Sequence, residues 1–237
     1  MTTDDLGFVL HTRPYRETSQ LVTLFTSGHG RLNAVSRASR QRRGGNQLRP
    51  FCPLRLSWRG RTDLKTLDAA EAAAAPLVLT GEKLFVGLYL NELLARLLHE
   101  HDPCPPLFER YHKTLELVVE AAVVEPVLRF FELTLLEDLG YGLRLDVDMD
   151  SGEPVTAGQR YLFFPGEGVR AYRPGEPVSH LFRGEQLLAI AGLNFDSQEV
   201  LRSAKRLARL ALEPYLGNKP LASRELFRRG PVESTAP

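Results

Sequence analysis

The chain of 237 residues is poor in cysteine, with only Cys52 and Cys104. Two cysteines cannot build a disulfide framework or a four-cysteine zinc site. The chain also lacks an apolar run near the roughly 20 residues that a membrane helix needs. Its first residues, Thr2 to Asp5, do not resemble the basic start of a secretion signal. These absences argue against membrane-spanning and secreted proteins, and we expect a cytoplasmic protein.

Motifs that carry catalysis are missing as well. The sequence contains no phosphate-binding Gly-x-x-x-x-Gly-Lys loop, no Gly-x-Ser-x-Gly elbow and no His-Glu-x-x-His helix. A Gly-x-Gly-x-x-Ala fragment at 166–171 is followed by Pro174 and Gly175, where a dinucleotide fold needs a helix. We therefore predict no catalytic residue and no cofactor.

Two groups of potential metal ligands have the wrong spacing. One group matches no zinc pattern and comprises His99, His101, Asp102, Cys104 and His112. The other, Asp146, Asp148 and Asp150, begins like a calcium loop. However, Ser151 and Ala157 stand where such a loop needs glycine and glutamate. The prediction is that the chain binds no metal.

Charge is distributed unevenly, although the chain as a whole carries only +1. Residues 1–80 hold 12 lysines and arginines against 6 aspartates and glutamates, whereas residues 81–140 hold 5 against 11. A basic N-terminal part is therefore joined to an acidic segment.

The hydrophobic fraction of the chain, 43%, is typical of one or two ordinary globular domains.

The basic charge concentrates between residues 31 and 65, where Asp63 is the only acidic residue. An excess of arginine over lysine favours bidentate contacts with phosphate, and Phe51 and Trp58 could stack on bases. The alternative is a solvated charged loop beside core aromatics, with Trp58 in the core. The predicted DNA-binding residues are Arg31, Arg37, Arg40, Arg42, Arg43, Arg49, Arg61 and Lys65.

Residues 1–80 have the pattern of five short strands. Alternating apolar residues and turn residues predict strands at 7–12, 20–26, 30–35, 53–58 and 63–70. This pattern favours a small barrel. Residues 36–47 have no apolar period, so we predict a mobile, exposed basic loop there.

Helical spacing begins near residue 81, with Thr80 as the expected N-cap. Helices are predicted at 81–100, 107–122, 125–139, 184–191 and 197–212, with breaks at 103–106 and at Pro214 and Gly217, followed by a tail. Glycines and prolines in 143–183 indicate loops and short strands. The expected class is α+β, divided into 1–80, 81–142, 143–183 and 184–237.

Two predicted helices in the second half of the chain carry arginines that could bind a partner. Arg129 lies in an apolar stripe, with Glu132 one turn on as its candidate ion-pair partner. It is either a surface arginine that snorkels to solvent or a receptor for a peptide carboxylate beside an apolar groove. The other helix carries a single basic face, suited to phosphate or an acidic partner: Arg202, Lys205, Arg206 and Arg209.

Several segments together resemble the RecO family of DNA repair proteins. They span nearly the whole chain in order, at residues 8–19, 87–93, 129–132, 139–142, 204–206 and 220–227. The resemblance implies an N-terminal OB-fold barrel and a helical domain with a small insertion. In many members this insertion is a four-cysteine zinc ribbon. This chain has no cysteine after Cys104, so we expect a ribbon-like shape around residues 151–154 without metal.

The resemblance also implies a function, which is not enzymatic. RecO-like proteins bind single- and double-stranded DNA and anneal complementary strands. Together with RecR, they help RecA to replace the single-strand binding protein SSB, which places them at the nucleoid. The acidic SSB tail, which ends in phenylalanine, would dock on the helical domain at Arg129, Arg202 and Arg206. Two alternatives are an adaptor with little DNA affinity and a metal-dependent nuclease.

Overall fold

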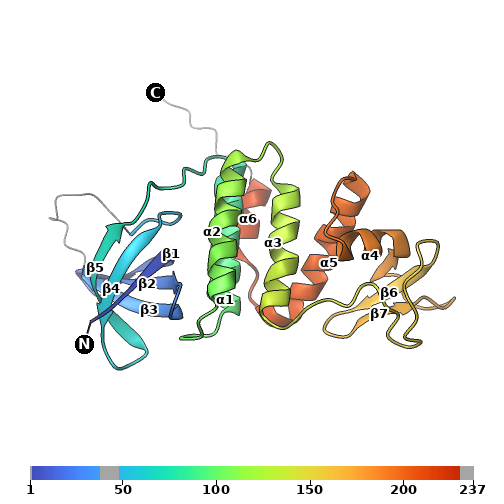
Figure 1. The fold of residues 1–237 in the computed structure, drawn as a ribbon, viewed down its shortest axis with the longest axis horizontal. Coiled ribbons are helices and arrows are strands. Elements are labelled where there is room, and N and C mark those ends of the chain that lie inside the picture. The colour runs from blue at the N-terminus through green and yellow to red at the C-terminus, as the bar shows by residue number, and fades with distance from the viewer. Residues whose placement is uncertain (1, 38–47, 230–237) are drawn as a thin grey trace. The chain divides into compact units, whose positions relative to one another are not determined.

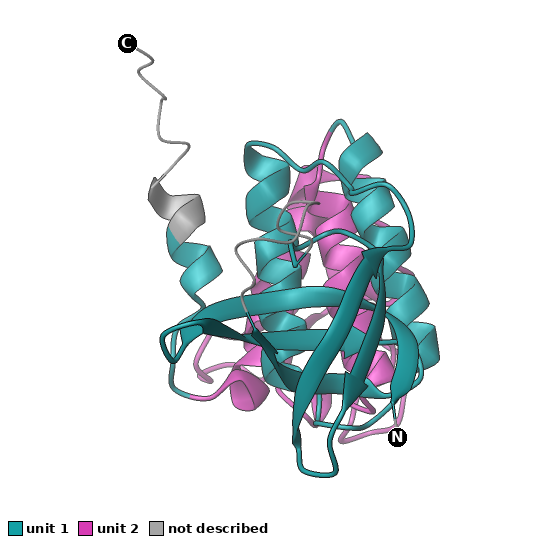
Figure 2. Cartoon of the chain, turned by 90° about the vertical axis from the view of Figure 1, so that its left-hand side faces the viewer, with its two compact units in different colours: residues 1–122, 218–237 teal, residues 123–217 magenta. Residues whose placement is uncertain are grey.

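The computed structural model describes residues 2–37 and 48–229, with the side chains of 226–229 excepted. The chain forms two compact units (Figure 2). The first unit comprises residues 1–122 and 218–237, and the second comprises residues 123–217. In the described part of the chain, no helix has the length and apolar character that crossing a membrane requires.

The first unit opens with a closed five-stranded barrel (Figure 1). Its strands are β1 (Thr3–Tyr15), β2 (Ser19–Thr26), β3 (Gly30–Arg37), β4 (Leu54–Arg59) and β5 (Leu64–Ala72). They close in the order β1-β2-β3-β5-β4, with β3 and β5 parallel and all other pairs antiparallel. The predicted barrel and its five strands are confirmed, although β1 is longer than expected.

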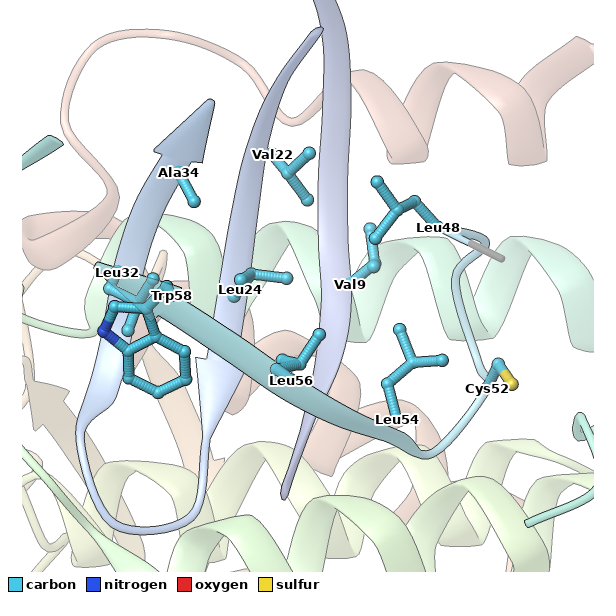
Figure 3. Packing of buried hydrophobic residues seen from close by; sticks show 10 residues of the cluster. All are labelled: Val9, Val22, Leu24, Leu32, Ala34, Leu48, Cys52, Leu54, Leu56 and Trp58. Carbon is cyan, nitrogen blue, oxygen red and sulfur yellow. The ribbon is translucent and has the colours of Figure 1, made fainter. Parts of the chain in front are cut away.

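Alternate residues of the strands fill the barrel interior (Figure 3). The buried cluster is Val9, Val22, Leu24, Leu32, Ala34, Leu48, Cys52, Leu54, Leu56 and Trp58. Trp58 is only 3% exposed, and Phe51 is buried as well. The hypothesis that these two aromatics stack on bases is therefore wrong, because apolar burial outweighs any surface role; Trp58 is a core residue, as the alternative held.

A β-bulge interrupts β1 between Val9 and His11. The side chain of Asn91 donates hydrogen bonds from Nδ2 to the carbonyls of Leu10 (3.1 Å) and Val9 (3.4 Å). Its Oδ1 accepts the hydroxyl of buried Tyr111 at 2.5 Å. Asn91, from the helix that follows the barrel, therefore supplies the hydrogen bonds that the carbonyls at the bulge need.

Two helices, α1 (Glu82–Leu97) and α2 (Pro105–Glu120), follow the barrel. Phe8 and Phe25 point away from the barrel interior and pack against Phe108 and Tyr111 of α2. Two details differ from the prediction. The N-cap of α1 is Gly81 rather than Thr80. The prolines at 105 and 106 form the first turn of α2 instead of lying in the break between helices, because proline fits the first helical turn.

The segment predicted as a tail contains a helix, α6 (Ala222–Arg229), that returns to α1. Glu92 accepts hydrogen bonds from the backbone N–H of Ala222 (3.0 Å) and Ser223 (2.9 Å) and from the Ser223 hydroxyl (2.6 Å). Arg96 donates to the carbonyls of Lys219 and Pro220. The carboxylate caps the start of α6, so its partners come from distant sequence.

The second unit combines helices with a three-stranded antiparallel sheet of order β7-β6-β8. Its elements are α3 (Glu125–Asp138), β6 (Arg160–Phe164), β7 (Gly168–Ala171), β8 (Leu181–Arg183), α4 (Gly184–Ala191) and α5 (Gln198–Leu216). Pro214 does not end α5, contrary to expectation. It lies in the last turn, where only one helical bond is lost, and the helix ends before Gly217.

We expect Asn91→Ala to lower the free energy of unfolding by about 2 kcal/mol, because the carbonyls of the bulge and the Tyr111 hydroxyl lose their buried partner. Tyr111→Phe removes a single hydrogen bond and should lower it by about 1 kcal/mol. Urea unfolding followed by the fluorescence of Trp58, the only tryptophan, measures both variants. Unchanged midpoints would contradict this role of Asn91.

The docking of α6 should depend on pH. Partial burial raises the pKa of Glu92, but hydrogen bonds from Ser223 and Ala222 and the charge of Arg96 outweigh it and lower the pKa below its ordinary value. Docking is therefore complete above the ordinary carboxyl pKa and weakens as pH falls through the lowered value. The hydrogen-exchange protection of residues 218–225, taken relative to the intrinsic rate at each pH, should fall at acid pH and in Glu92→Gln, but not in the exposed control Glu82→Gln. Equal exchange in both variants would rule out the cap.

Candidate nucleic-acid interface

The bulge decides which side chains of β1 face outward. Phe8 pairs with Phe25 and Val9 with core residue Leu24, but the next pair is His11 with Thr23. Beyond the bulge, odd-numbered residues of β1 therefore face away from the core, whereas Val9 before it faces inward. The outer face, so defined, consists of His11, Arg13, Tyr15, Ser19, Leu21, Thr23, Asn33, Val35 and Arg37.

One end of the outer face is tied to the segment after α1. The Thr23 hydroxyl donates to Asn33 Oδ1 (2.8 Å), and Asn33 Nδ2 donates to Glu100 (2.6 Å). Arg31 donates from Nε to the Leu98 carbonyl (2.8 Å) and forms an ion pair with Glu100 (3.1 Å). The Arg31 side chain is only 17% exposed. Arg31, a predicted DNA contact, therefore joins the barrel to the helices.

The other end of the outer face is open and basic. Arg13 and Arg37 are exposed on the two flanking strands, and half-buried Leu21 and Val35 lie between them in the register. Tyr15 is half-buried at the end of β1. This end thus places cations around a small apolar and aromatic centre.

The turn from β1 to β2 continues the same chemistry. Arg16 has a positive φ of 54°, and its guanidinium lies 5.2 Å from the centre of the Tyr15 ring. Glu17 brings one acidic side chain into this exposed turn. The arrangement combines cations with an aromatic face, as single-stranded nucleic acids require.

The β4 side of the barrel carries a different charge pattern. Arg55 and Arg59 are exposed on β4. Arg59 forms an ion pair with Asp68 of β5 at 2.7 Å, and Arg55 pairs in register with Glu71. Acidic residues of β5 therefore accompany the arginines of this side, so the outer face is the better candidate for binding phosphates.

Three of the remaining predicted DNA contacts belong to the described residues. Arg49 and Arg61 are exposed, and Lys65, the second residue of β5, donates to the Thr62 carbonyl of the β4–β5 turn at 2.8 Å. Arg40, Arg42 and Arg43 lie outside the described residues, which resume at Leu48. These assignments stay predictions.

Sequence reasoning missed Arg13, Tyr15 and Arg16 as site residues. They were noticed only as part of the family resemblance at 8–19, and strict alternation from Val9 would turn Arg13 and Tyr15 into the core. The signal that could have found them is the polar character of His11, Arg13 and Arg16 after an apolar run, which is incompatible with a core-facing row.

In the second unit, Arg129 is 5% exposed and forms an ion pair with Glu132 at 2.9 Å. The predicted pairing is confirmed, but the interpretation of Arg129 as a snorkelling surface arginine is wrong, because the guanidinium is buried. Its Nε is buried and has no hydrogen-bond partner among the residues that the structure describes. This group is therefore a buried cation with one unused donor.

Helix α5 presents the predicted basic face. The exposed basic residues of α5 are Arg202, Lys205, Arg206 and Arg209, opposite buried Leu201, Ala204, Leu207, Ala208 and Ala211. Lys205 pairs with Glu125 in the first turn of α3 at 3.2 Å. Arg206 lies 4.0 Å over the Phe182 ring and donates to the Leu181 carbonyl, so it fastens α5 to β8.

The histidines considered as metal ligands have other neighbours. His101 lies 3.8 Å from Asp63, and His112 packs on the Phe8 ring. Within residues 2–37 and 48–229, no three histidine, cysteine, aspartate or glutamate side chains gather as a metal site. Burial raises the pKa of the Cys52 thiol, which opposes any nucleophilic role.

The closed five-stranded barrel, in which β3 and β5 are parallel and helices follow the last strand, defines an OB-fold protein. Family models described as "Recombination protein O N terminal" and "Recombination protein O C terminal" match residues 1–76 and 79–225. The chain belongs to the RecO family of DNA repair proteins.

Similar proteins span the same length. A "DNA repair protein RecO" of Pseudomonas aeruginosa (strain UCBPP-PA14) is 49% identical over 224 residues, covering 93% of this chain and 92% of the relative. Proteins of the same name from Stutzerimonas stutzeri and Haemophilus influenzae (strain PittGG) are 47% and 45% identical. Each covers 93% of this chain, with 92% and 94% of the relative matched.

Proposed function

We propose that this chain is a recombination mediator that binds single- and double-stranded DNA, anneals complementary strands and helps RecA, together with RecR, to load on SSB-coated DNA. The observation that carries this proposal is the open end of the outer face, where Arg13 and Arg37 flank Tyr15, Leu21 and Val35. Strands 2 and 3 of OB-fold barrels commonly receive oligonucleotides in this way.

The chemistry of the outer face suits strand annealing. Arg13 and Arg37 stand on strands separated by one strand and are offset by two residues in the register, which puts their backbones about 12 Å apart. Guanidinium groups at this separation neutralise successive stretches of one backbone, while Tyr15 offers a stacking surface to any base. Contacts to phosphate and base faces leave the pairing edges free, as annealing requires.

The segment after β3 extends this surface in our proposal. Arg37 is the last residue of β3, and Arg40, Arg42 and Arg43 follow it directly in the sequence. Together with Arg49, Arg61 and Lys65, these residues would add phosphate contacts outside the outer face. Arg31 would act only through its structural contacts.

We further propose that the acidic tail of SSB docks on the second unit. Exposed Arg202, Lys205 and Arg209 offer positive charge along α5, and the Lys205–Glu125 ion pair puts this face beside α3. Arg129 lies one turn along α3 and has an unused buried donor suited to a terminal carboxylate. Arg206 would contribute charge while it holds β8.

DNA binding should depend on the outer face. We expect Arg13→Ala with Arg37→Ala to weaken binding of a labelled single strand at least tenfold and to reduce the slope of log affinity against log salt by about 1.4, for two lost phosphate contacts. Fluorescence titration at several salt concentrations measures both quantities.

The charge-matched control is Arg55→Ala with Arg59→Ala on β4, which should leave affinity nearly unchanged. Equal losses in both pairs would replace the proposed site by a diffuse charge effect. If Arg13→Ala with Arg37→Ala leaves DNA affinity unchanged, the DNA site lies on α5 or in the loops instead. Weak wild-type binding with a flat salt dependence would instead favour a protein adaptor.

Tail binding should depend on Arg129, but Arg129→Ala alone strips Glu132 of its buried arginine and should destabilise the chain by about 3 kcal/mol. Arg129→Met with Glu132→Leu removes both charges and should keep stability near wild type. We expect this pair to weaken binding of an acidic peptide ending in phenylalanine at least tenfold, with DNA affinity unchanged.

The same peptide with an amidated C-terminus is the matched ligand control. It should bind the wild type weakly and lose little further affinity in the double variant. Equal losses of peptide and DNA binding would reject this division of labour. Unchanged peptide binding would remove Arg129 from the site.

A further inference from the structure

Asp148 lies in the turn before the small sheet of the second unit and is only 6% exposed. Its Oδ1 accepts the backbone N–H of Asp150 (2.9 Å) and Ser151 (3.1 Å). Its Oδ2 accepts the N–H of Ala171 at 2.7 Å. Asp150 and Ser151 belong to the same turn, whereas Ala171 ends β7. One carboxylate therefore holds together two segments that are far apart in the sequence.

Backbone contacts hold the same two segments. The Asp148 N–H donates to the Glu153 carbonyl (2.9 Å), which closes the turn, and the Met149 N–H donates to Val169 of β7 (2.8 Å). Asp148 also forms an isolated bridge with Val169. The turn at 148–153 therefore runs along β7 in a fixed register, and the Asp148 carboxylate points toward the backbone N–H groups of both segments.

Ion pairs surround this carboxylate. Asp150 lies 3.1 Å from Arg173 and 3.8 Å from Arg170. Arg170 also pairs with Glu176 at 2.6 Å, and Glu176 accepts the N–H of Arg173 at 2.7 Å. These four side chains join the turn at 148–153 to the segment after β7.

The residues present here do not fit a zinc ion, which the family resemblance implies for this subdomain. Zinc needs four thiolate, imidazole or carboxylate ligands, and no cysteine follows Cys104. Both oxygens of Asp148 are occupied by N–H donors, whose positive ends would oppose a cation. Arg170 and Arg173 line the pocket around Asp148 and add further positive charge.

We propose that Asp148 takes the place of a structural metal: its carboxylate, with the ion pairs of Arg170 and Arg173, joins the turn at 148–153 to β7 and the segment that follows it. Charge-assisted hydrogen bonds are strong enough to organise a small sheet of this size. The fold of residues 146–183 is therefore independent of metal and depends on a single ionised side chain.

Acid should consequently loosen this subdomain. Burial raises the pKa of Asp148, but the N–H donors of Ser151, Ala171 and Asp150 outweigh it and lower the pKa below its ordinary value. The charged groups around it are Asp150, Arg170, Arg173 and Glu176, and the pKa of Glu176 is lowered too, first by its hydrogen bond with Arg170. When ionised, both carboxylates stabilise the folded subdomain of residues 146–183. This stabilisation is complete at neutral pH and is lost as pH falls through the lowered pKa values.

The test uses the full chain with Asp148→Asn and, as a matched control, Asp146→Asn, which changes an exposed carboxylate two residues away. Asparagine keeps one acceptor but turns an amide toward the Ala171 N–H. We expect limited proteolysis to cut Asp148→Asn within residues 143–183 about tenfold faster than wild type or Asp146→Asn. The urea midpoint reported by Trp58, in the first unit, should not move.

A chelator such as 1,10-phenanthroline should leave wild-type proteolysis unchanged. Faster cleavage with the chelator, or stoichiometric zinc in the purified chain, would overturn the proposal, as would equal behaviour of the two variants. If Asp148→Asn does not fold, wild-type hydrogen exchange decides the matter. A protected Ala171 amide, insensitive to chelator, supports the proposal, and an unprotected one contradicts it.

Discussion

The bulge in β1, held by Asn91, is the constraint on which the rest of the first unit depends. Before the bulge, ordinary alternation packs Phe8 outward against α2 and turns Val9 to the core; the bulge then turns Arg13 and Tyr15 to the outside. Without the extra residue, strict alternation would place these two polar side chains in the barrel interior. A single amide on α1 therefore determines both the docking of the helices and the composition of the open basic face.

The division between structural and binding residues follows from this arrangement. Residues shared with the family resemblance, such as Asn91 and Glu92, bind backbone groups of distant segments and fix the positions of β1 and α6. The arginines of the outer face and of α5 project to solvent, and the two sets lie in different compact units. In our proposal the arginines of the outer face bind a nucleic-acid backbone, and those of α5 bind an acidic peptide.

Much of the fold was predictable because it depends on local periodicity. The alternation in 20–26 and the helical spacing in 125–139 and 184–191 were sufficient to place β2, α3 and α4. Features set by distant partners were not predictable. Helix α6 is capped by Glu92, some 130 residues away, and Arg31 is held by Glu100. For the candidate site, charge counting found the basic region, but the position of the bulge was not predictable, because the only trace of it in the sequence is the polar character of His11 and Arg13 after an apolar run.

Hydroxyl-radical footprinting of the full chain with and without a single-stranded oligonucleotide tests the central claim most directly, because it reports side-chain protection by position. The account predicts that Tyr15, Leu21 and Val35 become protected while residues exposed on β4 and β5 stay reactive. Protection confined to α5, with the outer face unchanged, would contradict it.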